Sequence, residues 1–417
     1  MSMQRRRFLR LAGSALGLAA CRPGAAADTT APAGPPPAAP NPDPPLRPEP
    51  ILLGGQAQKI LILGGTGFLG PHLVEAARSR GHTVTLFNRG KTRPELFPDV
   101  EKLRGDRDGD LAALKGRTWD SVIDTSGYLP RVVRASAELL APSIRQYVFI
   151  SSISVYADTS KLGIDETSPV AVAPDPATEN VPEFYGALKA LCEQAAEQVL
   201  PGRTTSIRPG LIVGPYDPTD RFTYWPVRIA GGGEVLAPGD PAYAVQYIDV
   251  RDLAGFILTA IERGHAGIFN ATSLPLSMGD MLTRTRAALA SDAAFTWVDL
   301  EFLEQNKIQP WSDMPAWAPP TPGYEGFAAV KIDRAVAAGL TFRPLEDTVT
   351  ATMDWWNTLP EPRRAKLRAG ITREREAELL AAWHKLHPAP TEPATRKPKK
   401  PGAKKPGKPA EKQPAAG

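Results

Sequence analysis

The sequence predicts an α/β fold, in which a doubly wound parallel sheet is joined to a smaller, partly discontinuous C-terminal lobe. Three observations predict this class. Residues 59–63 form a short apolar run that leads into a glycine-rich turn and a segment of helical spacing. Short apolar runs then alternate with amphipathic segments as far as residue 215. From Tyr216 onward the chain is richer in Trp and Pro and the alternation lapses, so we expect the sheet domain at 59–215 and the lobe at 216–360.

The individual elements follow from hydrophobic periodicity and from residues that end helices. Gly81 closes the first helical segment, and the next apolar run follows it directly, which is typical of a β-α-β unit. Segments near 243–271 are expected to return to the sheet, and 361–387 to form a helical extension with a charged helix at 373–386. We expect strands at 59–63, 82–88, 119–124, 146–150, 204–208 and 267–271, and the remaining helices at 71–80, 132–140, 184–200 and 250–263.

Both ends of the chain have compositions that do not suit a packed core. Residues 28–58 are rich in Pro and Ala and predict an extended linker, and 388–417 are rich in Lys and Pro and predict a disordered tail. The net charge of the chain is only +4, and the tail carries most of the excess. The folded body is therefore near neutral, which argues against nucleic-acid binding by that body.

The first residues are typical of an export signal. Arg5, Arg6 and Arg7 precede an apolar run that is too short to span a bilayer, so residues 1–27 resemble a twin-arginine signal. Leu18 to Cys21 resembles a lipobox in which Cys21 becomes lipidated and anchors the protein to a membrane; cleavage near residues 25–27 is the competing outcome, and a basic N-terminus without an address is the alternative to export. We expect a periplasmic or otherwise extracytoplasmic protein that was folded, with its cofactor, before export.

The glycine-rich turn predicts a Rossmann-type dinucleotide site. Its first glycines permit a tight turn and a close approach of the backbone to a pyrophosphate, and the last allows the helix to pack on the strand. The helix that follows directs its N-terminal N–H groups at the phosphates. A purely structural turn is the alternative. The expected cofactor-binding residues of this turn are Gly64, Gly65, Thr66, Gly67, Phe68, Leu69 and Gly70.

The residues at the end of the second strand favour NADP over NAD. An acidic residue that would bind a ribose hydroxyl is missing, and Asn88 and Arg89 stand there instead. An acid would repel a 2′-phosphate, whereas Arg89 can pair with it, although Arg89 is also compatible with a solvated loop. After the third strand, Asp106 and Arg107 are further candidates, with Asp106 facing the adenine or serving as a turn carboxylate.

A tyrosine and a lysine one helical turn apart predict acid–base chemistry. Tyr185 and Lys189 fall on one face of a helix, and an ammonium group near a phenol lowers its pKa toward neutrality. Tyr185 would then exchange a proton with a substrate hydroxyl or carbonyl while hydride passes to or from the nicotinamide. The alternative is that the two residues form an exposed pair on the surface of an amphipathic helix. The five histidines show no spacing typical of a metal site, so no metal is expected.

Together these motifs resemble the extended short-chain dehydrogenase/reductase family, the NAD-dependent epimerase/dehydratase group, over residues 59–356. Further matching segments are 149–156, 185–189, 208–210 and 247–254. The resemblance implies that Ser152 binds the same substrate oxygen as Tyr185, with Ser154 as a substitute and Ser151 on the nicotinamide side. It also implies an NAD(P)-dependent oxidoreductase, epimerase or dehydratase that acts on a small hydroxyl- or carbonyl-bearing substrate, of which a sugar-like molecule is one option. A non-catalytic protein that retains the cofactor is the alternative, and a homo-oligomer is compatible with either.

The substrate side departs from the family pattern. Residues 124–128 replace the small Ala-rich turn that usually follows the fourth strand, and they include Tyr128 as a candidate substrate residue. The shape of the substrate pocket therefore does not follow from the family pattern. Pro215, Tyr216 and Arg221 belong to an aromatic and cationic cluster that suits a sugar or nucleotide face. Packing of the second lobe is the alternative explanation for that cluster.

Overall fold

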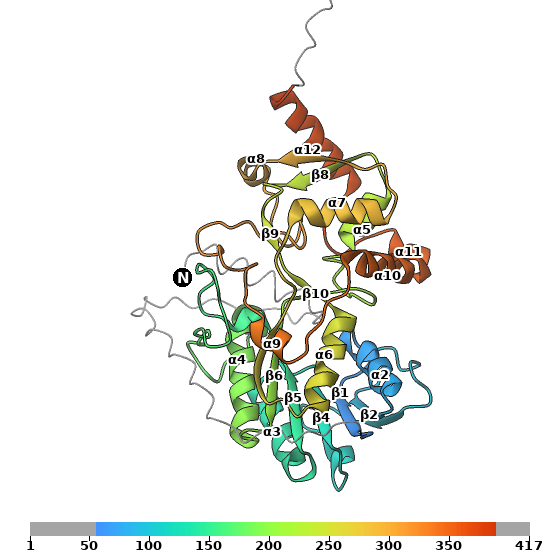
Figure 1. Ribbon diagram of the computed structural model, residues 1–417, viewed down its shortest axis with the longest axis vertical. Coiled ribbons are helices and arrows are strands. Elements are labelled where there is room, and N and C mark those ends of the chain that lie inside the picture. Colours follow the sequence, from blue (N-terminus) through green and yellow to red (C-terminus); the bar gives the residue numbers. More distant parts are fainter. Residues whose placement is uncertain (1–55, 389–417) are drawn as a thin grey trace, which may run out of the picture.

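A computed structural model describes residues 56–388 of the chain (Figure 1). The signal at 1–27 with Cys21, nearly all of the Pro/Ala-rich linker and the Lys/Pro-rich tail from residue 389 lie outside the described residues.

A seven-stranded sheet forms the centre of the larger domain, and every neighbouring pair of its strands is parallel. The order is β11-β6-β5-β4-β1-β2-β3, so the direction of strand progression reverses between β1 and β4. Ligands of doubly wound sheets bind beyond the carboxyl ends of the strands at such a reversal. The predicted α/β class is confirmed. The strands are β1 (Lys59–Leu63), β2 (Thr83–Asn88), β3 (Glu101–Arg104), β4 (Ser121–Asp124), β5 (Gln146–Ile150), β6 (Thr204–Pro209) and β11 (Gly267–Ala271).

Helices cover both faces of this sheet because the buried strands are apolar on both sides. In β1, Ile60 and Ile62 pack with α2 (Leu69–Ser79) and α6 (Val250–Glu262). The alternate residues, Leu61 and Leu63, pack with α3 (Pro130–Leu140) and α4 (Val181–Val199). Figure 1 shows the α2–α6 pair and the α3–α4 pair on opposite sides of the strands. This period of two explains why β1 is a continuous apolar run.

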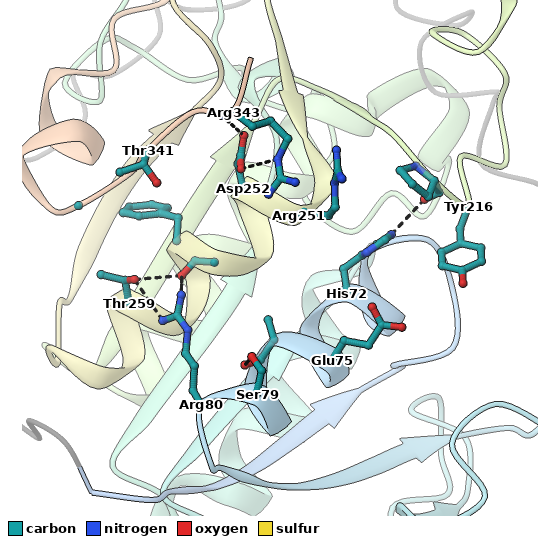
Figure 2. A pocket seen from close by; sticks show the side chains of 15 residues that line it. His72, Glu75, Ser79, Arg80, Tyr216, Arg251, Asp252, Thr259, Thr341 and Arg343 are labelled. Atoms are coloured by element: carbon teal, nitrogen blue, oxygen red, sulfur yellow. Dashed lines mark hydrogen bonds and ion pairs between the residues drawn. The ribbon is translucent and has the colours of Figure 1, made fainter. Parts of the chain in front are cut away.

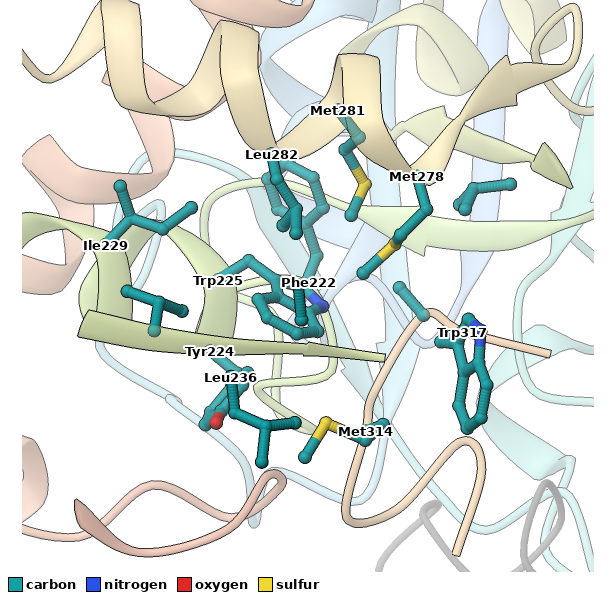
Figure 3. Close-up of a cluster of buried hydrophobic side chains, with 14 of the residues drawn as sticks. Phe222, Tyr224, Trp225, Ile229, Leu236, Met278, Met281, Leu282, Met314 and Trp317 are labelled. Atoms are coloured by element: carbon teal, nitrogen blue, oxygen red, sulfur yellow. The ribbon is translucent and has the colours of Figure 1, made fainter. Parts of the chain in front are cut away.

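The second lobe has its own core of aromatic and sulfur-containing side chains (Figure 3). Trp225 is fully buried there, and its indole N–H donates to the carbonyl oxygen of Pro315 at 2.7 Å. The surrounding elements are α5 (Tyr224–Ala230), β8 (Glu234–Pro238), α7 (Met278–Ala288), β13 (Ala294–Val298), α8 (Leu300–Gln305), α10 (Leu345–Thr358), α11 (Glu361–Arg364) and α12 (Arg373–Leu386).

The chain crosses between the two parts several times. After α5 and β8 it forms β9 and β10, returns to the sheet domain as α6 and β11, and then leaves again through β12. The crossing strands pair as β7 with β10 and as β9 with β12, and α9 packs near β11. Their bounds are β7 (Leu211–Val213), β9 (Ala244–Val245), β10 (Tyr247–Asp249), β12 (Leu276–Ser277) and α9 (Asp333–Ala337).

Differences from the predicted elements are concentrated in short pieces. Strands of two or three residues, such as β9 and β12, contain too few positions for a periodicity to be read. The helix expected at 184–200 begins at Val181, but its backbone is non-helical at Phe184. Across residues 56–388, no helix combines the length and the apolarity needed to cross a bilayer.

Candidate active site

The turn between β1 and α2 has the shape of a phosphate cradle. Gly64 and Gly65 have φ of +112° and +90°, which favour glycine. A Cβ on Gly70 would lie 2.4 Å from the carbonyl carbon of Gly65, so this glycine lets the helix pack against the turn. A Cβ on Gly67 would meet nothing within 4 Å, and Phe68 provides no side-chain cap for α2. The free N–H groups and the open space above Gly67 therefore fit a dinucleotide diphosphate.

An arginine that the sequence analysis did not single out lies across this turn. Arg93 donates from Nε to the carbonyl oxygen of Thr66 at 3.1 Å and from Nη2 to that of Gly67. Its guanidinium also lies 4.7 Å from the ring centroid of Tyr216. Arg93 lies in the loop after β2. Because β1 and β2 are neighbours in the sheet, the loops that follow them lie side by side, and this strand order is the one feature that could have predicted the contact of Arg93 with the glycine turn.

The end of β2 carries exposed positive charge. The Asn88 amide donates to the carbonyl oxygen of Gly64 at 3.0 Å, and its Oδ1 accepts from the Gly90 N–H and from Arg104. The Asn88 side chain therefore makes its hydrogen bonds with other residues of the chain. Arg89 is exposed and makes no hydrogen bond or ion pair with any other described residue. Arg104, another residue that the sequence analysis missed, lies opposite Asn88 in the β2–β3 register. Arg89 and Arg104 thus form a cationic edge beside the glycine turn.

Asp106 and Arg107 both make their contacts within the protein. The Asp106 carboxylate accepts the N–H of Asp108 at 3.1 Å, which makes it a turn carboxylate. Arg107 forms a buried, two-pronged ion pair with Asp124 at the end of β4. Tyr147 donates to the same carboxylate at 2.7 Å. The structure therefore places Arg107 as a support beneath the turn that follows β4.

The second predicted group gathers around the start of α4. The non-helical backbone at Phe184 (φ −115°, ψ 26°) means that regular helix starts at Tyr185. Ser152 begins a short 3₁₀ turn, and its Oγ accepts the N–H of Ser154 at 3.1 Å. The Ser152 hydroxyl lies close enough to the Tyr185 phenol to lower its pKa. The structure thus brings Ser152 and Tyr185 together, as the sequence analysis expected.

Gly186 makes this approach possible. A Cβ at position 186 would lie 2.0 Å from the carbonyl oxygen of Ser154, which is far inside van der Waals contact. We expect Gly186→Ala to push α4 away from the serine turn, lowering stability by about 1–3 kcal/mol and reducing turnover. Urea unfolding and steady-state rates measure both effects. The matched control is Gly255→Ala on α6, where the nearest atom is 3.6 Å away, and unchanged turnover in both variants would contradict the prediction.

Lys189 occupies the interior below Tyr185. Its Nζ donates to the carbonyl oxygens of Gly127 and Ile150 at 2.8 and 2.5 Å, at the carboxyl ends of β4 and β5. Burial lowers the pKa of Lys189 to about 8. The Tyr128 ring lies close to both predicted catalytic residues, 5.3 Å from Nζ of Lys189 and 6.5 Å from the ring of Tyr185.

The charge that acts on Tyr185 comes from the second lobe. Burial raises the pKa of Tyr185 above its ordinary value, and Ser152 and the positive charge of Arg221 offset only part of that rise. The lowering toward neutrality that the Tyr185–Lys189 spacing predicted is therefore not found in the free protein. Ser151 adds a buried hydroxyl that has no hydrogen-bond partner among residues 56–388. An unpaired buried hydroxyl is costly unless a ligand satisfies it, so Ser151 is a further group that fits a bound cofactor.

The four predicted substrate residues separate into two places. Tyr128 and Arg221 lie at Tyr185, whereas Pro215 and Tyr216 lie against α2. The carbonyl oxygen of Pro215 is 3.1 Å from Nε2 of His72, and the Tyr216 ring is 5.3 Å from the His72 ring. Pro215 and Tyr216 therefore border the glycine turn, where Arg93 also lies.

A separate cavity of about 710 Å³ opens between α2 and α6 (Figure 2). None of Ser152, Tyr185 and Lys189 lines it. Its arginines are paired inside the protein: Arg80 with Glu262, Arg251 with Asp249 and Arg343 with Asp252. In the described part of the chain, no cluster of three or more His, Cys, Asp or Glu residues is arranged to hold a metal ion.

Comparison with known families finds a match to the NAD dependent epimerase/dehydratase family. The family model matches residues 60–128 and 110–272, which together span about half of the chain.

Several characterised proteins are similar in sequence. The chain is 30% identical to chloroplast stem-loop binding protein of 41 kDa b of Arabidopsis thaliana over 51% of this chain and 58% of that protein, less than two thirds of its length. It is 30% identical to the 2-alkyl-3-oxoalkanoate reductase of Stenotrophomonas maltophilia over 56% of this chain and 76% of that protein. It is 28% identical to a 3 beta-hydroxysteroid dehydrogenase/Delta 5-->4-isomerase of Mycobacterium tuberculosis over 48% of this chain and 60% of that protein.

Solved structures share the fold at lower identity. The enzyme WbmG of Bordetella bronchiseptica, in complex with NAD, superposes with a TM-score of 0.55 at 16% identity, covering 73% of this chain and 95% of that one. The human epimerase family protein SDR39U1 with NADPH gives 0.50 at 21% identity, covering 71% and 99%.

Proposed function

The chain belongs to the NAD dependent epimerase/dehydratase family, and on that premise we propose that it is an NAD(P)-dependent enzyme that oxidises or reduces a hydroxyl- or carbonyl-bearing small molecule at Tyr185. The observation that carries this proposal is the placement of Tyr185 beside the Ser152 turn, on a sheet whose first turn is an open phosphate cradle. Similar proteins named as a reductase and a dehydrogenase, and similar folds bound to NAD or NADPH, support it.

The proposed mechanism assigns each residue one task. Residues 64–70 would hold the diphosphate of a bound cofactor, and the buried Ser151 hydroxyl would donate to it or accept from it. A nicotinamide bound there would supply or accept the hydride. Tyr185 accepts the proton of a substrate hydroxyl during oxidation or donates a proton to a carbonyl oxygen during reduction, and Ser152 orients that oxygen by a hydrogen bond. Lys189 fixes the carboxyl ends of β4 and β5 beneath them.

Cofactor binding is the first test of this function. Titration of the purified protein with NADP and with NAD, followed by calorimetry and by thermal melting, should show binding and a rise in melting temperature. At a hundred times Kd the stabilisation is about 2.7 kcal/mol. If neither nucleotide binds and none co-purifies with the folded protein, the proposed function is wrong.

We propose that NADP is the preferred cofactor, because Arg89 and Arg104 place unopposed positive charge at the end of β2. Arg89→Asp should weaken NADP binding by about tenfold or more, since a charge-assisted hydrogen bond to phosphate is lost and a repulsion is added, while NAD binding stays nearly unchanged. Calorimetric titration of both nucleotides measures the ratio. Arg117→Asp, at an exposed ion pair with Glu101, is the control. Equal losses for NADP and NAD would contradict the preference.

We also propose that the enzyme is exported in its folded state and acts outside the cytoplasm on a small-molecule substrate. The support is the twin-arginine and lipobox-like sequence at the N-terminus. Mass spectrometry of the protein purified from its native host should find a mature N-terminus after this segment, with a lipidated Cys21 if the lipobox is used. An intact Met1 in all of the protein would contradict export.

A further inference from the structure

Arg221 presents an unpaired guanidinium group at the candidate active site. The side chain is only partly exposed, and its Nε donates to Oγ1 of Thr219 at 3.1 Å. Neither terminal nitrogen forms a hydrogen bond or an ion pair with any residue from 56 to 388. The group interacts electrostatically with the buried carboxylate of Asp217 and with Tyr185. Because Asp217 is linked to Arg221 only through Thr219, the terminal nitrogens keep their N–H groups for an anionic ligand.

The loop around Arg221 holds the guanidinium in place. Thr219 donates from Oγ1 to the buried carboxylate of Asp217 at 2.7 Å and accepts from Arg221, so three side chains form one relay. Asp220 has φ of +58°, and its carboxylate accepts from Arg363 and from the N–H of Arg368. This strained backbone is held by the C-terminal segment, which is the arrangement expected for a preorganised binding group.

An aromatic ring packs against Arg221. The Arg221 guanidinium lies 5.2 Å from the ring centroid of Trp311, and Trp311 also lines a void of about 10 Å³ beside the serine turn, which has room for about one water molecule. Nine of the ten residues that line this cavity are apolar. The exception, Gln246, bonds Ser273 and Val330 through its side-chain amide. The cavity lining comprises Ile153, Leu211, Ala244, Val245, Gln246, Trp311, Ala316, Ala318, Phe327 and Ala328.

We propose that Arg221 is the specificity-determining residue for a substrate carboxylate, and that the enzyme takes a hydroxy or oxo acid. This inference rests on the proposed function, because it assigns the substrate class of the Tyr185 site. A planar carboxylate can accept two N–H groups from the free edge of the guanidinium.

Binding of an acid and of its neutral ester tests the proposal without requiring turnover. The probes are 2- and 3-hydroxyoctanoate and their methyl esters. Each is titrated by calorimetry into the protein saturated with NADPH, because the reduced cofactor cannot accept a hydride and the hydroxy acids therefore bind without reacting. At least one acid should bind about tenfold to hundredfold more tightly than its ester, as expected for hydrogen bonds to a charged group. Arg221→Gln should abolish this preference, and Arg221→Lys should retain part of it. Arg284→Gln, at an exposed ion pair with Glu346, is the matched control and should retain all of it.

The outcomes separate this inference from the proposed function. If NADPH does not bind the wild-type protein, the proposed function fails and the inference fails with it. If NADPH binds but no acid is preferred over its ester, or if Arg221→Gln keeps the preference, the carboxylate assignment is wrong while the proposed function stands. Binding of UDP-glucose that is lost in Arg221→Gln would likewise overturn the assignment in favour of a phosphate ligand.

Discussion

Tyr185→Phe should lower turnover by about 10²–10⁴-fold, because it removes the only proton that the proposed acid–base residue can exchange with the substrate oxygen. The change deletes one hydroxyl and keeps the ring that packs near Tyr128. Cofactor affinity should therefore change by no more than about twofold, well below the cost of losing a charged hydrogen bond. Single-turnover rates with NADPH and an active substrate, together with a nucleotide titration, measure both quantities.

The neighbouring phenol is the control for this experiment. Burial raises the pKa of Tyr128 and the negative charge of Asp124 adds to the rise, whereas Ser152 and Arg221 offset part of the rise at Tyr185, so Tyr128 is the poorer proton-transfer group of the two. Tyr128→Phe should reduce turnover far less than Tyr185→Phe does. Wild-type turnover in Tyr185→Phe with bound cofactor would exclude Tyr185 as the proton-transfer group. Loss of nucleotide binding in that variant would show that the substitution had damaged the fold instead.

Residues close together in the sequence were the predictable part of this site. The glycine turn lies between a strand and a helix that periodicity alone identifies, and the structure confirms β1, α2 and β2 around it. Tyr185 and Lys189 are four residues apart on one helix, so their shared helix needed only local information.

Groups that depend on tertiary contacts could not be predicted in the same way. The i, i+4 spacing suggested that Lys189 acts on the Tyr185 phenol, but its Nζ is bound to the carbonyl oxygens of Gly127 and Ile150. The charge that offsets part of the rise in the pKa of Tyr185 comes from Arg221, 36 positions farther along the chain by residue number, on a loop held by the C-terminal segment. Spacing identifies neighbours on one helix, whereas the packing of a second lobe decides which distant cation reaches them.

The same limit applies to the cofactor side. Asn88 and Arg89 were identified because they end β2, but Arg104 became visible only when the strand order placed β3 beside β2. Arg107 was expected to face the cofactor from its position after β3. It is instead buried against Asp124, a contact that joins the loop after β3 to the last residue of β4, 17 residues farther along the chain. A charged residue after a strand therefore has two possible roles, and burial decides between them.

Breaking the buried pair of Glu193 and Arg208 should destabilise the protein by about 3–5 kcal/mol, because a guanidinium would be left without its counter-charge in the interior. Both side chains are almost fully buried, and two hydrogen bonds of 2.9 and 2.7 Å join them. Arg208 also donates to the hydroxyl of Tyr156, which donates to Asn270 on β11. This network ties the helix of Tyr185 to the segment after the serine turn and to the returning strand.

Glu193→Gln keeps the shape of the side chain and removes its charge, so its effect reports the electrostatic part of this network. Glu346→Gln, whose pair with Arg284 is substantially exposed, is the control. The free energy of unfolding should decrease by less than about 1 kcal/mol in that control and by more in Glu193→Gln. Urea denaturation followed by tryptophan fluorescence and by circular dichroism measures the shift, and coincidence of the two curves tests whether the sheet domain and the lobe unfold together. Equal, small effects in the two variants would mean that packing of α4 against the sheet, rather than the Glu193–Arg208 pair, holds Tyr185 beside Ser152.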